Sequence, residues 1–267
     1  MIDYHLHAEY SDDSKARLLD YAVAAKRERF RAIAITDHLD FPPESPGYSP
    51  QEQQSILEQA RAAAPKTYIA LGAEFTWRPG LAEQIKLWQE LLEFDYTIGS
   101  VHYLDEVNTE ISSHRAEDFF ASTSVEEAYG RYFDMLLRTA ESGLFNTLGH
   151  LDICKRYGVQ YYGAFDPRRW EVELRRVFRA CQRTDTGLEL NLSGLRQHPQ
   201  ESYPALATLK MARQEGLRLI TVGSDSHRVE QFSASLIQQG FRLLKEAGFE
   251  QVFYWQKGKP IGVPLTS

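Results

Sequence analysis

Six of the eight histidines lie in short clusters with acidic or polar residues, and each cluster follows an apolar stretch typical of a β-strand. A carboxylate ends one further stretch of this kind. Imidazoles and carboxylates gathered from several strand ends are the ligands that a site with several metal ions requires. The pattern therefore predicts a metalloenzyme. The clusters and the carboxylate are His5-Leu6-His7, Asp37-His38, Glu74, Ser100-Val101-His102, Gly149-His150-Leu151-Asp152 and Ser224-Asp225-Ser226-His227.

Two of the clusters carry candidate ligands two residues apart. His5 and His7 stand on an extended chain, so both side chains point to the same face and could bind one metal ion. Asp225 and His227 have the same spacing, and Asp12 or Asp13, in the loop after His7, could reach a neighbouring ion. An isolated pair of this kind is more often a polar strand end with incidental histidines. Because several such clusters occur in this chain, metal binding is a stronger interpretation than incidental histidines.

The remaining candidate ligands each close a strand-like run. Glu74 ends the run 68–75, where a buried carboxylate is costly unless it is paired or bound to a metal. A carboxylate can also bridge two cations. His102 and His150 close two further runs. His38 alone would be a structural histidine, but Asp37 beside it could orient a ligand imidazole or a bound water.

Basic residues follow two of the same strand ends. Arg156 comes shortly after the 149–152 cluster, and Arg196 follows the stretch 191–195. A guanidinium at either place could bind two phosphate oxygens at once. The alternative for both arginines is an ordinary exposed basic residue, and the sequence leaves this open.

The other residues capable of chemistry are expected to play no part in it. Cys154 and Cys181 have no paired spacing, so neither a disulfide framework nor a zinc ribbon is indicated. Cys154 lies near the 149–152 cluster, but a phosphatase cysteine motif is missing, and we expect a buried, inert thiol. His114 and His198 lie in polar loops, and we expect both to be exposed to solvent.

The elements that must position these residues alternate regularly along the chain. Strand-like stretches cover 2–5, 32–36, 68–75, 96–101, 147–150, 188–192 and 217–223, and helical periodicity covers 18–30, 51–64, 81–93, 125–142, 168–184, 203–215 and 232–247. Such alternation predicts an α/β fold with a parallel sheet. Seven repeats without a glycine-rich dinucleotide motif favour a closed or nearly closed barrel. Active-site groups of such barrels lie at the carboxyl ends of the strands, where the candidate ligands stand.

Two long connections interrupt the alternation. Residues 41–50 are rich in proline, serine and glycine, and 103–123 form a polar stretch after His102. We expect both to be loops over the mouth of the barrel, where they could recognise the rest of a substrate. The chain contains no linker, so residues 1–267 are predicted to form a single domain.

Composition narrows the class of partner. The net charge of −7 argues against a nucleic-acid surface, which needs clustered lysine and arginine. A small phosphorylated substrate remains possible, because metal ions would supply positive charge locally. The N-terminus has no basic and apolar leader, and no apolar run approaches the roughly 20 residues of a membrane span. We therefore expect a soluble, cytoplasmic protein without membrane contact.

In their order and rough spacing, these motifs resemble the PHP (polymerase and histidinol phosphatase) family over nearly the whole chain. The matching residues are His5-x-His7, Asp37-His38, Glu74, His102, His150 and Asp225-x-His227. The resemblance implies a distorted seven-stranded (β/α)7 TIM-like barrel with two or three divalent metal ions at its mouth. One ion would bind His5, His7, Glu74 and Asp225. Glu74 would bridge to a second ion held by His102 and His150, and a third would bind His38, His227 and Asp13.

Within the family, the histidinol-phosphate phosphatase branch is the most similar. The stretches 100–104, 149–156 and 194–196 resemble that branch. The resemblance implies that Arg156 and Arg196 bind phosphate. It also implies hydrolysis of L-histidinol phosphate to L-histidinol and inorganic phosphate in histidine biosynthesis.

The expected chemistry is metal-assisted hydrolysis of a phosphomonoester. Zn, Fe or Mn would suit the imidazole and carboxylate ligands. Glu74 would stand beside the attacking water, and Asp225, His227 or a water on a metal could protonate the leaving alkoxide. Two alternatives remain. The first is a PHP phosphoesterase for another substrate, such as phosphotyrosine, a nucleotide or an oligonucleotide end. The second is a metal-binding module without catalytic activity.

Overall fold

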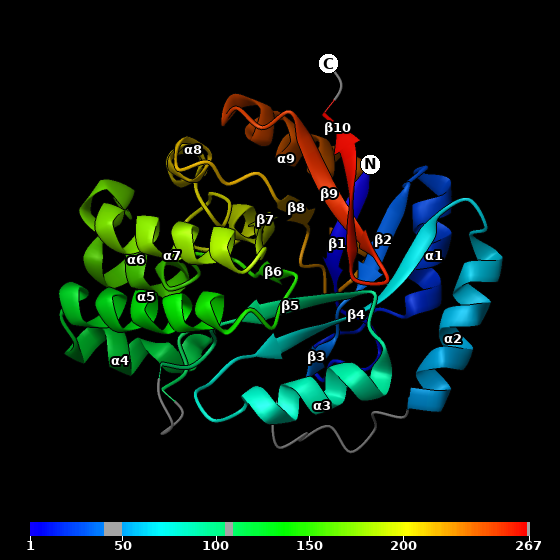
Figure 1. Ribbon diagram of the computed structural model, residues 1–267, viewed down its shortest axis with the longest axis horizontal. Helices are drawn as coiled ribbons and strands as arrows, with labels where there is room; N and C mark the ends of the chain where they lie inside the picture. The colour runs from blue at the N-terminus through cyan, green and yellow to red at the C-terminus, as the bar shows by residue number, and fades with distance from the viewer. Residues whose placement is uncertain (40–49, 105–108, 266–267) are drawn as a thin grey trace.

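Seven parallel strands follow one another in chain order around a nearly closed barrel (Figure 1). The computed structural model describes residues 1–39, 50–104 and 109–265, with the backbone alone for 50–52. The barrel strands are β1 (Ile2–Leu6), β2 (Ala32–Ile35), β4 (Tyr68–Thr76), β5 (Tyr96–Ser100), β6 (Thr147–Leu148), β7 (Gly187–Asn191) and β8 (Ile220–Gly223). A two-residue strand, β3 (His38–Leu39), pairs with the end of β4.

The barrel closes between its first and last strands at their carboxyl ends. Leu6 forms a parallel bridge with Ser226 just beyond β8. The amide of His7 donates to the carbonyl of Ser226 at 3.0 Å, and the amide of Asp225 donates to the carbonyl of His5 at 2.9 Å. These bonds bring the first and last histidine clusters of the chain together. The predicted (β/α)7 barrel is confirmed.

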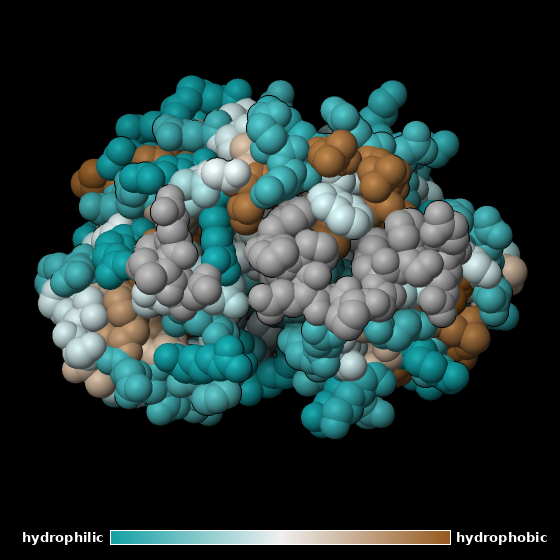
Figure 2. Space-filling model, turned by 90° about the horizontal axis from the view of Figure 1, so that it is seen from below, coloured by the Kyte–Doolittle hydropathy of each residue, from teal (hydrophilic) through white to brown (hydrophobic). Residues whose placement is uncertain are grey.

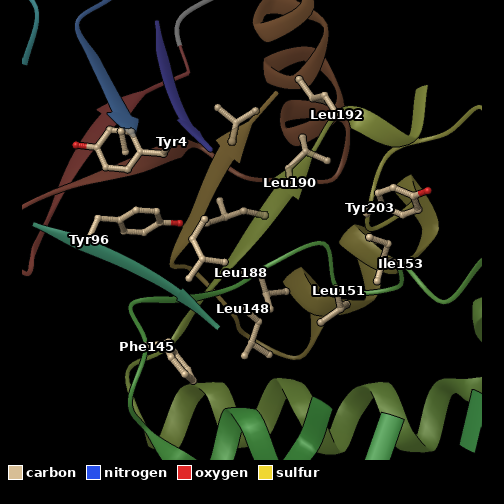
Figure 3. Packing of buried hydrophobic residues seen from close by; sticks show 14 of the residues in the cluster. Tyr4, Tyr96, Phe145, Leu148, Leu151, Ile153, Leu188, Leu190, Leu192 and Tyr203 are labelled. Atoms are coloured by element: carbon tan, nitrogen blue, oxygen red, sulfur yellow. The ribbon is translucent and has the colours of Figure 1, made fainter. Parts of the chain in front are cut away.

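Helices connect the strands and cover the outside of the barrel (Figure 1). Seven of them correspond to the predicted helical stretches: α1 (Leu18–Arg27), α2 (Pro50–Ala63), α3 (Ala82–Leu92), α5 (Val125–Ser142), α7 (Glu171–Arg183), α8 (Leu206–Gln214) and α9 (Ala234–Glu246). Helix α9 packs closely against the strands at Gly240, which has no side chain. A methyl group there would lie 3.0 Å from Leu192 and from Val222. Figure 3 shows the leucines of β7 packed among neighbouring hydrophobic residues of this layer.

A β-hairpin covers the end of the barrel at which the strands begin. It consists of β9 (Gln251–Gln256) and β10 (Lys259–Pro264), which pair antiparallel. The hydroxyl of Tyr4 donates to the carbonyl of Trp255 at 2.7 Å. The ring of Tyr96, the first residue of β5, lies 5.0 Å from that of Trp255. The opposite end, where the strands finish, therefore carries the candidate ligands.

Several local predictions were wrong. The predictions missed the hairpin and α6 (Lys155–Tyr162). The second half of the connection 103–123 is helical rather than irregular, with a 3₁₀ turn at His114–Ala116 and α4 at Glu117–Ser122. Strand β6 has only two residues, so His150 lies in the turn that follows it. Residues 41–49 of the other predicted loop lie outside the described residues.

In the described parts of the chain, no helix is long and apolar enough to cross a lipid bilayer. The face shown in Figure 2 is mostly hydrophilic, and its hydrophobic residues form small separate groups. One hydrophobic core cluster includes residues from Ile2 to Leu265. The N- and C-terminal parts of the chain therefore share a core.

Candidate metal centre

The carboxyl ends of the strands bring all nine predicted ligands into three groups. Within each group, one candidate ligand atom per residue lies within 4.8 Å of the others. The first group is His5, His7 and Asp225; the second is Glu74, His102 and His150; the third is His7, Asp13, His38 and His227. The parallel strands produce this convergence, because their carboxyl ends all meet at one rim of the barrel.

Glu74, near the end of β4, is the centre of the arrangement. Its carboxylate is almost fully buried and divides its two oxygens between neighbours. Oε1 lies 2.9 Å from Nε2 of His150 and 3.4 Å from Nε2 of His102. Oε2 lies 3.3 Å from Nε2 of His5 and 3.4 Å from Nε2 of His7. This is the arrangement expected of a carboxylate that bridges two cations.

His7 has neighbours in two of the groups. Its Nε2 lies 3.0 Å from Nε2 of His5 and 3.5 Å from Oδ1 of Asp225. Its ring also stacks on that of His227, with 4.1 Å between centroids. The sequence assigned His7 to the first ion alone, whereas the structure places it between the first and third groups.

Asp13 lies in the third group, beside His227 and His38. Its Oδ2 lies 3.1 Å from Nε2 of His227 and 3.8 Å from Nε2 of His38. The loop that carries Asp13 is tied to the end of β8, because the amide of Lys15 donates to the carbonyl of His227 at 3.0 Å.

The electrostatics of the centre fit bound cations. Burial opposes ionisation of Glu74 and Asp225, yet the surrounding histidines hold the pKa of each well below its usual value. Burial, with His227 and His38 nearby, lowers the pKa of His7 to about 3. Ionised carboxylates and an uncharged imidazole are the forms that bind metal ions. The nitrogen and oxygen donors suit Zn, Fe or Mn.

A cavity of about 570 Å³ opens on the centre. Glu74, Asp225 and His227, the predicted catalytic residues, all line it. Arg156 stands on its wall, where Nη1 donates to the carbonyl of Ser112 at 2.7 Å. The cavity therefore places a guanidinium and the candidate metal ligands around one space of a size that suits a small molecule.

Comparison with known proteins identifies the family. The PHP domain family model matches residues 3–193, which is well over half of the chain. The chain belongs to the PHP domain family.

Relatives of this PHP protein include several histidinol-phosphatases. A probable histidinol-phosphatase of Deinococcus radiodurans is 27% identical over 85% of this chain and 86% of that protein. A histidinol-phosphatase of Lactococcus lactis subsp. lactis is 25% identical over 94% of this chain and 93% of that protein. The crystal structure of L. lactis histidinol phosphate phosphatase with zinc, L-histidinol and phosphate matches with a TM-score of 0.84 and 26% identity. That match covers 97% of this chain and 98% of the other, and it confirms the predicted fold.

Around the centre of this PHP protein, hydrogen bonds orient the histidines. The Ser11 hydroxyl donates to Oδ1 of Asp37 at 2.8 Å, because a carboxylate can only accept. Its oxygen is then the acceptor for Nδ1 of His7, 3.0 Å away, and for the amide of His38. A proton on Nδ1 of His7 leaves the lone pair of Nε2 free for a metal. Asp37 is thus linked to His7 through Ser11, and its predicted orienting role would act by this route.

Sequence reasoning missed Glu189 and Asn191. Both lie in β7 and are fully buried. Oε1 of Glu189 lies 2.6 Å from Nδ1 of His5, and Nδ2 of Asn191 donates to Oδ2 of Asp225 at 3.2 Å. An available signal was the alternation Leu188-Glu189-Leu190-Asn191 in a buried strand, which puts two polar side chains on the inner face.

The other predicted residues stand as follows. Arg196 is exposed and is not among the described residues that line the cavity; its guanidinium donates to the backbone carbonyls of Ser224, at 2.9 Å, and Asp225. Cys154 is buried, and burial raises the pKa of its thiol well above the usual value, as expected of an inert cysteine. His114 and His198 are both exposed, although His114 also borders the cavity.

Proposed function

We propose that this PHP protein is a metal-dependent phosphatase that hydrolyses L-histidinol phosphate to L-histidinol and inorganic phosphate. The observation that carries the proposal is the cavity that is lined both by Arg156 and by candidate metal ligands grouped around Glu74. The similarity to the L. lactis enzyme, whose structure contains zinc, L-histidinol and phosphate, supports the substrate. The role would be in histidine biosynthesis and would place the protein in the cytoplasm, with residues 1–267 acting as one domain.

The three groups would hold two or three divalent ions. His5, His7, Asp225 and Glu74 would bind the first, and Glu74, His102 and His150 the second. His38, His227 and Asp13, with His7 at their edge, would bind a third. Such ions lower the pKa of water at the site and offset the negative charge that develops on the phosphoryl oxygens.

The arginines would bind the phosphate group. Nη1 of Arg156 donates to the carbonyl of Ser112, and this hydrogen bond holds the guanidinium at the cavity wall. The other N–H groups of Arg156 would then donate to phosphate oxygens. Arg196 donates two N–H groups to carbonyls beside Asp225, so it would both fix that ligand and offer its remaining donors. We therefore propose a phosphate-binding role for both, with a second, positioning role for Arg196.

The titrating groups at the cavity differ in their ability to supply a proton. Asp225 has a lowered pKa and is a carboxylate at neutral pH. Burial opposes protonation of His227, but Asp13 and Asp225 outweigh it and raise the pKa of His227 above its usual value. Of these two residues, His227 is thus the better donor to the leaving alkoxide when the third group holds no ion. Glu74 stays ionised and would orient the attacking water.

The test is steady-state phosphate release by protein loaded with zinc or manganese. We expect a preference for L-histidinol phosphate over p-nitrophenyl phosphate, a phosphotyrosine peptide and a 3′-phosphorylated oligonucleotide. A preference of about 100-fold in kcat/KM, or about 2.7 kcal/mol of transition-state binding, would support the proposed substrate. Equal, slow rates would leave a PHP phosphoesterase for another substrate, and no release from any ester would indicate a metal-binding module.

A further inference from the structure

Glu189 lies inside the barrel between two of the candidate metal groups, and it is fully buried. One oxygen, Oε1, lies 2.6 Å from Nδ1 of His5 in the first group. The other, Oε2, accepts the backbone amide of His150 in the second group at 2.8 Å. The carboxylate thus contacts a side chain in one group and the backbone in the other without being a candidate ligand itself.

The orientation of Glu189 is fixed by Asn191, two residues further along β7. Oδ1 of Asn191 accepts the amide of Ser193 at 2.9 Å, so its Nδ2 must point the other way. That nitrogen donates to Oε2 of Glu189 and to Oδ2 of Asp225, at 3.2 Å each. Oε2 therefore accepts hydrogen bonds from the amide of His150 and from Nδ2 of Asn191, and neither group can act as an acceptor instead. Oε1 is left to pair with His5.

The backbone of β8 leaves room for this contact. A methyl group on Gly223 would lie 2.3 Å from Oε1 of Glu189 and 2.4 Å from Cβ of His5. Only glycine at position 223 allows both side chains to occupy the space, since real Cβ atoms do not approach so closely.

We propose that Glu189 is a positioning residue that holds His5 with its proton on Nδ1 and ties His5 to the backbone of His150. The carboxylate can only accept, so Nδ1 of His5 must donate to it. Nε2, which faces Glu74 and His7, then presents its lone pair to a metal ion. One buried carboxylate thereby orients ligands of two groups. The inference rests on the metal centre of the proposed function and needs no particular substrate.

Replacing Glu189 by glutamine tests the proposal at the level of hydrogen bonds. The amide has one accepting oxygen, which the amide of His150 and Nδ2 of Asn191 require. Its NH₂ group would then face Nδ1 of His5 and force the imidazole proton onto Nε2, where it opposes metal binding. If the glutamine amide is turned the other way, its NH₂ group faces the amide of His150 and Nδ2 of Asn191, which are both donors. Either way, the E189Q variant loses part of the network.

The chain offers a matched control in Thr221 of β8, the register partner of Glu189. It is fully buried, and its hydroxyl has no hydrogen-bond partner among the described residues. T221V therefore changes a buried polar group in the same region of the barrel without touching a candidate ligand.

The experiment measures zinc stoichiometry and affinity of the purified metal-free protein by chelator competition, without substrate. We expect E189Q to weaken at least one zinc site 10- to 100-fold, as for other partners of metal-binding histidines, while T221V binds as the unmodified protein does. Unchanged zinc affinities in folded E189Q would overturn the proposal.

A second variant covers the case in which E189Q does not fold. E189D keeps the buried charge, but its side chain is one carbon shorter and cannot reach both His5 and His150. We expect weakened zinc binding here too. Unmodified affinity in E189D would show that the buried charge alone is needed and would overturn the positioning role.

The unmodified protein provides a readout of its own. In ¹⁵N NMR of the zinc-loaded protein, we expect His5 to carry its proton on Nδ1 and zinc on Nε2. Zinc on Nδ1 would refute the proposal whatever the variants do. Conversely, a protein that binds zinc in this way but does not hydrolyse L-histidinol phosphate would refute the proposed function and leave the role of Glu189 intact.

Discussion

Ser11 accepts a hydrogen bond from Nδ1 of His7 at 3.0 Å, and its own proton goes to Asp37. One hydroxyl thus determines which nitrogen of His7 faces the metal centre. The relationship has the same logic as that between Glu189 and His5, so each histidine of the first cluster has its own buried acceptor.

Removing the Ser11 hydroxyl should weaken metal binding. In S11A, Nδ1 of His7 loses its acceptor, while Asp37 keeps the amide of Ala8 as a donor at 2.6 Å. We expect roughly a 10-fold loss of zinc affinity with little change in fold, measured by chelator competition and circular dichroism. S122A, which alters an exposed hydroxyl on α4, serves as the control. Unchanged zinc affinity in S11A would contradict the role of this hydrogen bond.

Glu74 should be indispensable because its two oxygens contact candidate ligands from all three groups, His5, His150 and His38 among them. E74Q removes the negative charge between His5 and His150 and replaces one oxygen by a group that cannot bind a cation. We expect loss of at least one bound zinc and a fall of about 10³-fold in kcat/KM, or about 4 kcal/mol. E83Q, at an exposed glutamate on α3, should behave as the unmodified protein. Full zinc content with near-normal activity in E74Q would exclude a bridging role.

The two arginines should respond differently to substitution. R156A removes a guanidinium from the cavity wall, so we expect KM and the inhibition constant of inorganic phosphate to rise 10- to 100-fold with zinc affinity unchanged. R168A, at an exposed arginine of the 3₁₀ turn before α7, is the control.

R196A should affect the metal centre as well as phosphate binding. Its side chain donates to the carbonyls of Ser224 and Asp225, and two lost hydrogen bonds correspond to about 1–2 kcal/mol of unfolding free energy. We expect lower zinc affinity, which R156A lacks, and a larger fall in Tm than in R156A, which loses a single hydrogen bond of this kind, to Ser112. Identical profiles for the two variants would show that Arg196 does not position Asp225.

Zinc binding should depend steeply on pH. In the ion-free protein, burial opposes protonation of His5 and His227, but nearby carboxylates raise the pKa of both above the usual value. Their contribution to stability is therefore full below pH 6.5 and is lost as the pH rises through the raised values. An ion must displace these protons, so zinc affinity should increase from pH 6 to pH 8 by about a factor of ten per unit for each proton released. Titrations at three pH values measure this slope, and pH-independent affinity would contradict the prediction.

Much of the fold could be read from the chain because buried parallel strands appear as continuous apolar runs. All seven barrel strands fall within or beside the predicted stretches, and Val125–Ser142 matches its helix at both ends. The predicted ends of helices and strands were wrong where contacts between residues far apart in the chain decide them. Tyr203 pairs with Asn191 instead of starting α8, and Pro204 separates it from that helix. The hairpin β9–β10 was missed although its local signals are present: 252–255 are β-branched and aromatic, and Lys257-Gly258 form a two-residue turn with positive φ at both residues.

The sequence by itself determined the types of candidate ligand and their place at the carboxyl ends of strands, since both follow from residue identity and local periodicity. The tertiary structure alone decided how they group. Closure of the barrel between Leu6 and Ser226 brings His7 against His227, and strand order sets the two oxygens of Glu74 toward different histidines. The tertiary structure also sets Arg196 in hydrogen bonds with backbone carbonyls and brings Glu189 against Nδ1 of His5. These contacts join residues far apart in the chain, so they depend on strand register and barrel closure, which local sequence patterns do not specify.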